Sequence, residues 1–480
     1  MPLITNDVKV NYLTGFCCMH VLTPKQNSLP IIFNLGEVHG DITKPCTTEP
    51  NSLSISNFLR HLNILGSKFR IEIYSENFMD HVLLSMAKNP ETTKVTWEKQ
   101  LQNSEKSEGT FRGALGIFNH SENTLSCYYN DLRKKHPDIF KAKCEYPNII
   151  WQYSDARKTF KSRATMHEFY TIENVTDAFH NIESIIQEIA FIDDNYYTNY
   201  PTFLKKPSLM DTIEKKRAYM DKVIKNGTKG QDMVTLINIF QLIIDFHENP
   251  GNAAETIMNM PAILKQFQKQ TVIKDIAEFK LQVKEYITYI LNEYDKSDKI
   301  FVCYIDFMQM FVLFLKHNTL EHFQKVTETI SSLLSTKPMG KYPLYNADSG
   351  SAPVNLMIAP SSIILDIYFI LRIFKPPQKE LICNLAGSKH IEHISFFLTE
   401  ILHLYDNAIF TAKNEKQCVH LDFDMNLNET LRIKKTESRL MKSKIIRNTQ
   451  SIRSKSKTRR NSRTKTRIRN KRESKRRLTI

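Results

Sequence analysis

Two stretches of this chain, far apart in the sequence, place a histidine three residues after a glycine at the end of an apolar run. Residues 30–35 lead into Gly36-Glu37-Val38-His39, and residues 380–385 lead into Gly387-Ser388-Lys389-His390. Glycine allows the backbone to turn sharply where a strand ends, so that a following histidine is able to point into a crevice. These two motifs make Glu37, His39 and His390 candidate catalytic residues.

Two further apolar runs end in charged residues. Residues 69–74 precede Glu76, and residues 148–153 precede Asp155 and Arg157. Imidazoles and carboxylates that converge on one crevice are suited to hold a divalent first-row metal ion. Such an ion lowers the pKa of a bound water molecule and supplies the nucleophile for hydrolysis. We therefore add Glu76, Asp155 and Arg157 to the candidate catalytic residues.

Each of these motifs also has a purely structural interpretation. Glu37 and His39 alternate with Val38, which is compatible with the polar face of a strand end. Asp155 and Arg157 are compatible with a surface ion pair, worth at most about 1 kcal/mol. The catalytic interpretation depends on all of these residues meeting at one place.

The four apolar runs are predicted to be strands, and helical stretches separate the first three. A helix is predicted over residues 55–65, with Ser54 as its N-cap and Gly66 as its end. Further helices are predicted over residues 79–87 and 122–135. Alternation of strands and helices predicts an α/β fold, with a mainly parallel sheet and flanking helices. Open parallel sheets carry their sites beyond the carboxyl ends of the strands, where the candidate residues lie.

The chain divides into four predicted parts. Residues 1–165 form the N-terminal part of the α/β domain, and residues 166–350 form a helical insertion in which apolar residues recur at helical spacing. Residues 351–425 form the C-terminal part of the α/β domain, and residues 431–480 form a disordered basic tail. Within the third part we predict a helix over 361–374, a strand over 380–385 and a helix over 391–404, preceded by a loop over 337–353.

The net charge of +15 comes from the tail alone. Residues 431–480 contain 21 Lys and Arg against 2 Asp and Glu, whereas the rest of the chain contains 45 basic and 49 acidic residues. Residues 447–480 have no aromatic side chain, so they are unable to bury a core or to stack on bases. Regularly spaced cations bind phosphate backbones without sequence specificity, through counterion release. The predicted nucleic-acid or polyanion contacts are Arg453, Lys455, Lys457, Arg459, Arg460, Arg463, Lys465, Arg467, Arg469, Lys471, Arg472, Lys475, Arg476 and Arg477.

Cysteine content and hydropathy exclude several classes of protein. Eight cysteines with no Cys-x-x-Cys pair are too sparse for a disulfide scaffold or a zinc ribbon, so we expect free thiols and a reducing compartment. The first ten residues lack the profile of a signal peptide. The longest apolar stretch, residues 301–315, is short for a bilayer and is predicted to be a buried helix rather than a transmembrane segment.

The Gly-x-x-His motifs and the strand-end glutamate resemble the superfamily of erythromycin esterases, haem-binding ChaN lipoproteins, and the TraB and Tiki proteins. This resemblance implies a divalent metal ion bound by His39, Glu76 and His390, with Glu37 as a further ligand or general base. An esterase-like version instead implies that His39 activates water, oriented by a carboxylate, while Arg157 stabilises the oxyanion.

The chain also resembles uncharacterised proteins of giant DNA viruses. The shared pattern is Gly36-Glu37-Val38-His39, Cys46 and Asp155-Ala156-Arg157, and the chain departs from it at Gln152-Tyr153, where a histidine is expected. The resemblance implies a viral protein with a hydrolase-like body acting on ester or peptide bonds, located in the host cytoplasm at the viral factory or in the virion. The basic tail is also compatible with the nucleus. The alternative is a non-enzymatic virion or replication-site protein that binds nucleic acid through its tail.

Overall fold

The computed structural model of the chain describes a stretch near each end of the sequence and part of the helical middle. The described residues are 3–5, 8–37, 52–75, 148–153, 233–294, 299–317, 321–322, 325, 328–329, 352–376, 379–412, 418–421, 425–427 and 429–436. The predicted helices over 79–87 and 122–135, and the basic tail beyond residue 436, lie outside these ranges.

A six-stranded sheet forms the centre of the described part, in the order β10-β4-β5-β9-β7-β8. Its strands are β4 (Cys18–Pro24), β5 (Ile31–Glu37), β7 (Ile71–Ser75), β8 (Ile149–Tyr153), β9 (Leu381–Gly387) and β10 (Tyr405–Thr411). The four predicted strands, β5, β9, β7 and β8, pair in parallel. The prediction missed β4 and β10, which pair antiparallel at one edge and make the sheet mixed. The α/β class is therefore confirmed, with a mixed sheet.

Two small three-stranded sheets accompany the central one. The first has the order β12-β1-β2, with β1 at Leu3–Thr5, β2 at Val8–Val10 and β12 at Met425–Asn426. The second has the order β11-β3-β6, with β3 at Tyr12–Thr14, β6 at Ser52–Ser54 and β11 at Cys418–His420. Both sheets join the beginning of the chain to residues beyond 417, and the sequence analysis anticipated neither.

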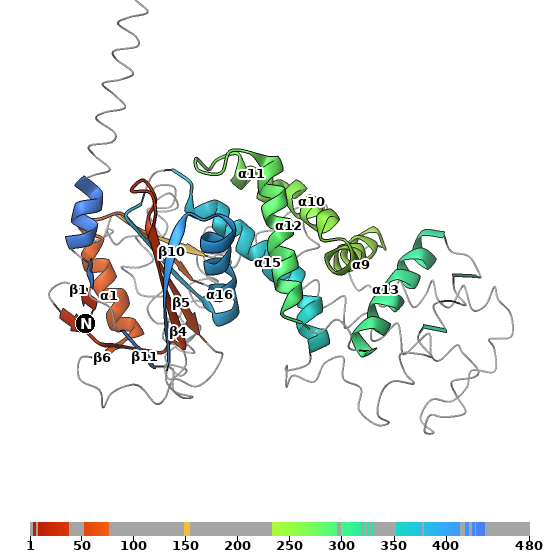
Figure 1. Cartoon of the computed structure of the whole chain (residues 1–480), viewed down its shortest axis with the longest axis horizontal. Coiled ribbons are helices and arrows are strands. Elements are labelled where there is room, and N and C mark those ends of the chain that lie inside the picture. The colour runs from red at the N-terminus through yellow and green to blue at the C-terminus, as the bar shows by residue number, and fades with distance from the viewer. Residues whose placement is uncertain are drawn as a thin grey trace, which may run out of the picture.

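One face of the central sheet is covered by α1 (Ile55–Leu65) (Figure 1). The helix has the predicted bounds, and the hydroxyl of Ser54 caps it by accepting a hydrogen bond from the amide of Asn57. Side chains alternate along a strand, so Ile31, Phe33 and Leu35 of β5 point to the same face of the sheet. There they form one core cluster with Phe58 and Leu62 of α1.

Helices lie on the opposite side of the sheet, some packed against it and others extending away from it (Figure 1). They are α9 (Met233–Glu248), α10 (Pro250–Asn259), α11 (Pro261–Phe267), α12 (Ile276–Asn292), α13 (Lys299–His317), α15 (Ala352–Ile373), α16 (Ser388–Phe396) and the π-helix η4 (Phe397–Ile401). Their core includes Phe279, Phe311 and Ile370 and is continuous with Ile32 and Ile382 of the sheet. The predicted helical character of the middle of the chain, including residues 301–315, is confirmed wherever it is described.

Three predicted boundaries differ from the structure. The helix predicted over 361–374 begins nine residues earlier, at Ala352, because Pro360 lies within the helix without ending it. The helix predicted over 391–404 begins at Ser388, so the second Gly-x-x-His motif forms its first turn, and it closes as η4. Residues 429–436 are helical and Leu431 is buried, so the folded body continues past the predicted start of the tail at residue 431.

The structure also bears on the membrane and cysteine predictions. None of the helices in the described ranges has the length and apolarity needed to cross a membrane. Cys17, Cys18 and Cys383 are free thiols, as expected, whereas Cys418 is disulfide-bonded, which the sequence analysis did not expect.

Gly36 permits the close packing of α16 on the end of β5. A Cβ atom at this position would lie 2.4 Å from the sulfur of Cys18 and 3.0 Å from the Cα of Ser388. We predict that Gly36→Ala lowers the free energy of unfolding by about 1–3 kcal/mol, because the added methyl group would have to displace the Cys18 sulfur and push the backbone of α16 away from β5. Urea denaturation measures this change.

The matched control is Gly251→Ala, in α10, where a Cβ atom meets nothing closer than 3.4 Å. This variant is expected to be neutral or to gain up to about 1 kcal/mol, since alanine reduces the entropy of the unfolded chain. Equal stability of the two variants would contradict the packing role of Gly36.

Candidate functional site: a histidine–aspartate pair at the carboxyl edge of the sheet

The four predicted strands end at the same edge of the sheet, as the catalytic hypothesis requires. Glu37 at the end of β5 is paired with Gly387 of β9, and Ser75 at the end of β7 is paired with Leu385 of β9 and Tyr153 of β8. The residues that follow three of these ends, namely His39, Glu76, Asp155 and Arg157, lie outside the described residues, as does Cys46. Of the six candidate catalytic residues, the structure describes Glu37 and His390.

The structure places Glu37 and His390 on different faces of the sheet. Glu37 is 4% exposed, and strand alternation puts it on the face of Ile31 and Phe33, which α1 covers. His390 lies in the first turn of α16, which packs on the opposite face. The cavity that His390 lines does not include Glu37. The described residues therefore do not bring this candidate pair into one pocket.

His390 is instead paired with an aspartate from the helical layer. Its Nδ1 lies 2.6 Å from Oδ1 of Asp366, in α15. The other carboxylate oxygen, Oδ2, accepts a hydrogen bond of 2.9 Å from the hydroxyl of Tyr286, in α12. The Asp366 side chain is 2% exposed and that of His390 is 19% exposed. A buried carboxylate thus fixes the orientation of a partly accessible imidazole.

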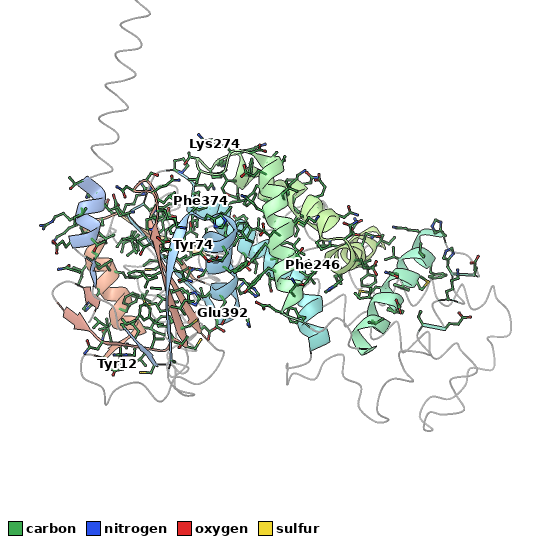
Figure 2. The ribbon with its side chains drawn as sticks, in the orientation of Figure 1. Tyr12, Tyr74, Phe246, Lys274, Phe374 and Glu392 are labelled. Atoms are coloured by element: carbon green, nitrogen blue, oxygen red, sulfur yellow. The ribbon has the colours of Figure 1, made fainter. Side chains whose placement is uncertain are left out.

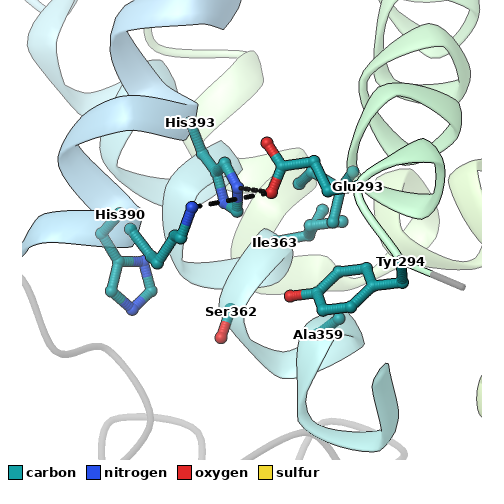
Figure 3. Close-up of a pocket in the computed structure, with 9 residues that line it drawn as sticks. Glu293, Tyr294, Ala359, Ser362, Ile363, His390 and His393 are labelled. Atoms are coloured by element: carbon teal, nitrogen blue, oxygen red, sulfur yellow. Dashed lines mark hydrogen bonds and ion pairs between the residues drawn. The ribbon is translucent and has the colours of Figure 1, made fainter. Parts of the chain in front are cut away.

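His390 lines a cavity of about 600 Å³ between α12, α15 and α16. Its wall also includes Ser362 and Tyr294, and the hydroxyl of Tyr294 points toward Ser362 from the opposite wall (Figure 3). This volume lies within the range of about 300–1,000 Å³ that is typical of small-molecule sites. The imidazole is therefore accessible to a small molecule that enters the cavity.

A second histidine–carboxylate pair lies in the same wall. His393 Nε2 lies 3.2 Å from Oε2 of Glu293, and the ammonium group of Lys389 lies 3.9 Å from the same oxygen (Figure 3). The hydrogen bond from His393 is the main reason why the pKa of Glu293 is lowered, so Glu293 stays ionised at neutral pH. Burial, together with the charge of Glu293, raises the pKa of Tyr294 and keeps its hydroxyl protonated.

The described residues do not form a complete metal site. Within the described ranges, no group of three or more His, Cys, Asp or Glu side chains is arranged to hold a metal ion. Two of the three proposed ligands, His39 and Glu76, lie outside those ranges. His390 itself fits a metal ligand as well as a general base, because metal-bound histidines usually donate their other ring nitrogen to a carboxylate.

Four residues of this site were not predicted from the sequence, namely Asp366, Tyr286, Glu293 and His393. Two signals were available for part of this set. Asp366 is the one charged residue within residues 363–371, an otherwise apolar helical stretch, and charged side chains are rarely fully buried unless they are paired. His390 and His393 are three residues apart, which places them on one face of a helix. No sequence signal links Tyr286 or Glu293 to these residues.

Comparisons with known proteins add no family assignment. No protein-family model, curated protein or solved structure matches the chain.

The ion pair of Glu293 with His393 predicts a change of stability in acid. A carboxylate with a lowered pKa in the folded state stabilises the protein above its usual pKa of 4.5, and the stabilisation is lost as the pH falls through the lowered value. We expect Glu293→Gln to cost about 0.5 kcal/mol at pH 7, since the pair is partly screened by solvent, and to cost progressively less below about pH 4.

Urea unfolding between pH 3 and pH 7 measures this effect, with Glu285→Gln, an exposed residue of the same helix, as the control. A constant difference between Glu293→Gln and the wild type over the whole range would contradict the assignment.

Proposed function

We propose that this protein is a hydrolase of ester or peptide bonds in which His390 is the general base. The observation that supports this proposal is the 2.6 Å contact between His390 Nδ1 and the buried carboxylate of Asp366, in the wall of a cavity of substrate size. The carboxylate holds one ring nitrogen, so Nε2 is the atom assigned to the substrate side. This arrangement is the usual means of orienting a catalytic imidazole.

The proposed reaction follows from these positions. A water molecule gives a proton to Nε2 of His390 while its oxygen attacks the acyl carbon of the substrate. The imidazolium that forms is stabilised by Asp366 and then gives the proton to the leaving alcohol or amine. The products are a carboxylic acid and an alcohol or amine, and the histidine returns to its neutral form.

A hydrogen-bond donor for the developing oxyanion is also needed. The hydroxyl of Tyr294 is our candidate, because it lines the same cavity and its raised pKa keeps the proton that it would donate. The esterase-like resemblance gives this role to Arg157, which lies outside the described residues.

A metal-dependent version of the same activity is supported by the resemblance to the Gly-x-x-His superfamily. In that version His390 would be a ligand together with His39 and Glu76, and the ion would supply the activated water. Asp366 would then orient a metal ligand rather than a general base. The metal content of the purified protein, with and without His390→Ala, separates the two versions.

Removing either member of the pair is predicted to abolish turnover. We expect His390→Ala and Asp366→Asn each to lower kcat/KM by about 10²–10⁴-fold, because the first variant loses the base and the second loses its orientation. Hydrolysis of a panel of chromogenic esters and fluorogenic peptides provides the measurement.

The matched controls are His317→Ala and Asp406→Asn, which replace the same residue types at exposed positions outside the cavity. Both controls should retain wild-type turnover. Circular dichroism verifies that all four variants are folded. Activity that survives in folded His390→Ala and Asp366→Asn variants would rule out this site.

A second function, binding of nucleic acid or another polyanion, is supported by the charge of residues 437–480. This segment contains 18 Lys and Arg against 2 Asp and Glu. We propose that it tethers the body to nucleic acid, which suits a protein of a large DNA virus acting at the viral factory, in the virion or in the nucleus. The same tail is compatible with a non-enzymatic body.

The tail proposal predicts a specific change in salt dependence. Replacing Arg459, Arg460 and Arg463 by glutamine should reduce the slope of log Kd against log salt concentration by up to about 2.7 for duplex DNA, since each lost phosphate contact removes about 0.9. Filter binding at several salt concentrations measures the slope. Replacing Ser451, Ser454 and Ser456 by alanine is the matched control and should leave it unchanged; equal slopes in the two triple variants would contradict the tether.

A further inference from the structure

A second cavity, of about 660 Å³, lies at the opposite edge of the sheet from His390. Its walls come from the loop before β5, the segment between α11 and α12, and the end of α15 with the residues that follow it. Lys274 and Phe374, both in its wall, lie at the same end of the molecule (Figure 2). We propose that this basic cavity binds a small organic anion, a molecule with an apolar body and one sulfonate, phosphate or carboxylate group.

Charge is the first argument for an anionic ligand. Lys274, Lys375 and Lys379 line the cavity, and none of its described lining residues carries a negative charge. The carboxylate of Glu72, in β7, which contacts one of these lysines, is already engaged within the core. It contacts the Lys379 ammonium group at 2.7 Å and accepts a hydrogen bond of 2.8 Å from the hydroxyl of Tyr74. The remaining cations at the cavity therefore lack a matching anion among its described lining residues.

The environment of Lys375 gives the second argument. Its ammonium group donates a hydrogen bond to the side-chain oxygen of Gln266, which is neutral. Burial and then the nearby charges of Arg372, Lys269 and Lys379 lower the pKa of Lys375 to about 8, and Glu72 opposes this only weakly. A bound anion would offset this repulsion, so electrostatic attraction would favour its binding.

The remaining walls fit the apolar body of such a ligand. Leu29, Pro30, Val272, Phe374 and Leu404 line the cavity beside the three lysines. Ser28 and Thr271 supply hydroxyl groups at the same walls. Apolar walls with a few convergent polar groups are typical of sites for small molecules rather than for inorganic ions.

The test uses the full-length protein and simple probes that hydrolysis leaves intact. Isothermal titration calorimetry at pH 7 compares 1-naphthalenesulfonate, 1-naphthoate, neutral 1-naphthol and inorganic phosphate. We expect both naphthyl anions to bind at least tenfold more tightly than 1-naphthol and than phosphate. Lys375→Gln and Lys274→Gln should each weaken the binding of both anions, by about tenfold for Lys375.

Two control variants test whether the anions bind at this cavity. Lys284→Gln, an exposed lysine of α12 outside the cavity, should leave binding unchanged. His390→Ala should also leave it unchanged, because the basic cavity does not depend on the proposed hydrolase site. At pH 8, titrations in two buffers of different ionisation enthalpy should reveal proton uptake of up to about half a proton per ligand, which Lys375→Gln abolishes.

Three outcomes would overturn the proposal. The first is the absence of binding by both naphthyl anions. The second is equal affinity for 1-naphthol, which would show an apolar crevice without anion selectivity. The third is unchanged affinity in Lys274→Gln, which replaces an exposed residue and so tests the site even if Lys375→Gln disturbs the fold.

Discussion

The position of β9 between β5 and β7 is the constraint on which the described fold depends. This strand comes from near the C-terminal end of the body, yet it pairs in parallel with two strands from the N-terminal part. Without β9, β5 and β7 would not share a sheet. The functional candidates lie in the segments on either side of β9. The residues after α15 lead into the strand, and α16 begins where the strand ends. Both cavities therefore have part of their walls in the segments that enter or leave this strand.

Buried polar contacts link the helices to one another and to the sheet at defined points. Lys379 contacts Glu72 with both side chains at most 5% exposed, Asp366 contacts Tyr286 and His390, and Ser395 accepts a hydrogen bond from Asn34. Such contacts add little net stability, because each group loses its hydration when it is buried. They are costly to break, however, since an unpaired partner would remain in the core. We infer that these contacts determine the position at which each helix packs, whereas the apolar contacts supply most of the stability of the fold.

The sequence predicted local structure better than it predicted contacts between distant segments. The apolar runs and the Ser54 cap identified four strands and α1, because these signals lie within a few residues of one another. The antiparallel edge formed by β4 and β10 was missed, since residues 18–24 and 405–411 have no local feature that marks them as partners. The start of α15 was predicted wrongly just after Pro360, because a proline more often begins or ends a helix than lies inside one.

The same difference applies to the candidate site. His390 was identified from the glycine three residues before it, and it does line a cavity at the predicted edge. Its partner was not identified, because Asp366 lies on another helix and meets His390 only through tertiary packing. Glu37 differs from His390 in this respect, since its motif was identified correctly as a strand end and alternation places it on the face that α1 covers. Sequence spacing locates a residue along its own element and leaves open which neighbour it meets.

The amide pair in the middle of β5 and β9 has a consequence for how the protein is made. Asn34 and Asn384 face each other in register, and the Asn384 amide donates to the Asn34 side-chain oxygen at 3.3 Å, so a shift of one residue would separate them. Residues 76–380 lie between β7 and β9, and a ribosome needs roughly 15 to 60 s to add them. During that interval β5 and β7 have been synthesised, but the strand that joins them has not. Their open edges are then available for pairing with other chains. The first strands of the nascent protein therefore stay open to such pairing until β9 emerges.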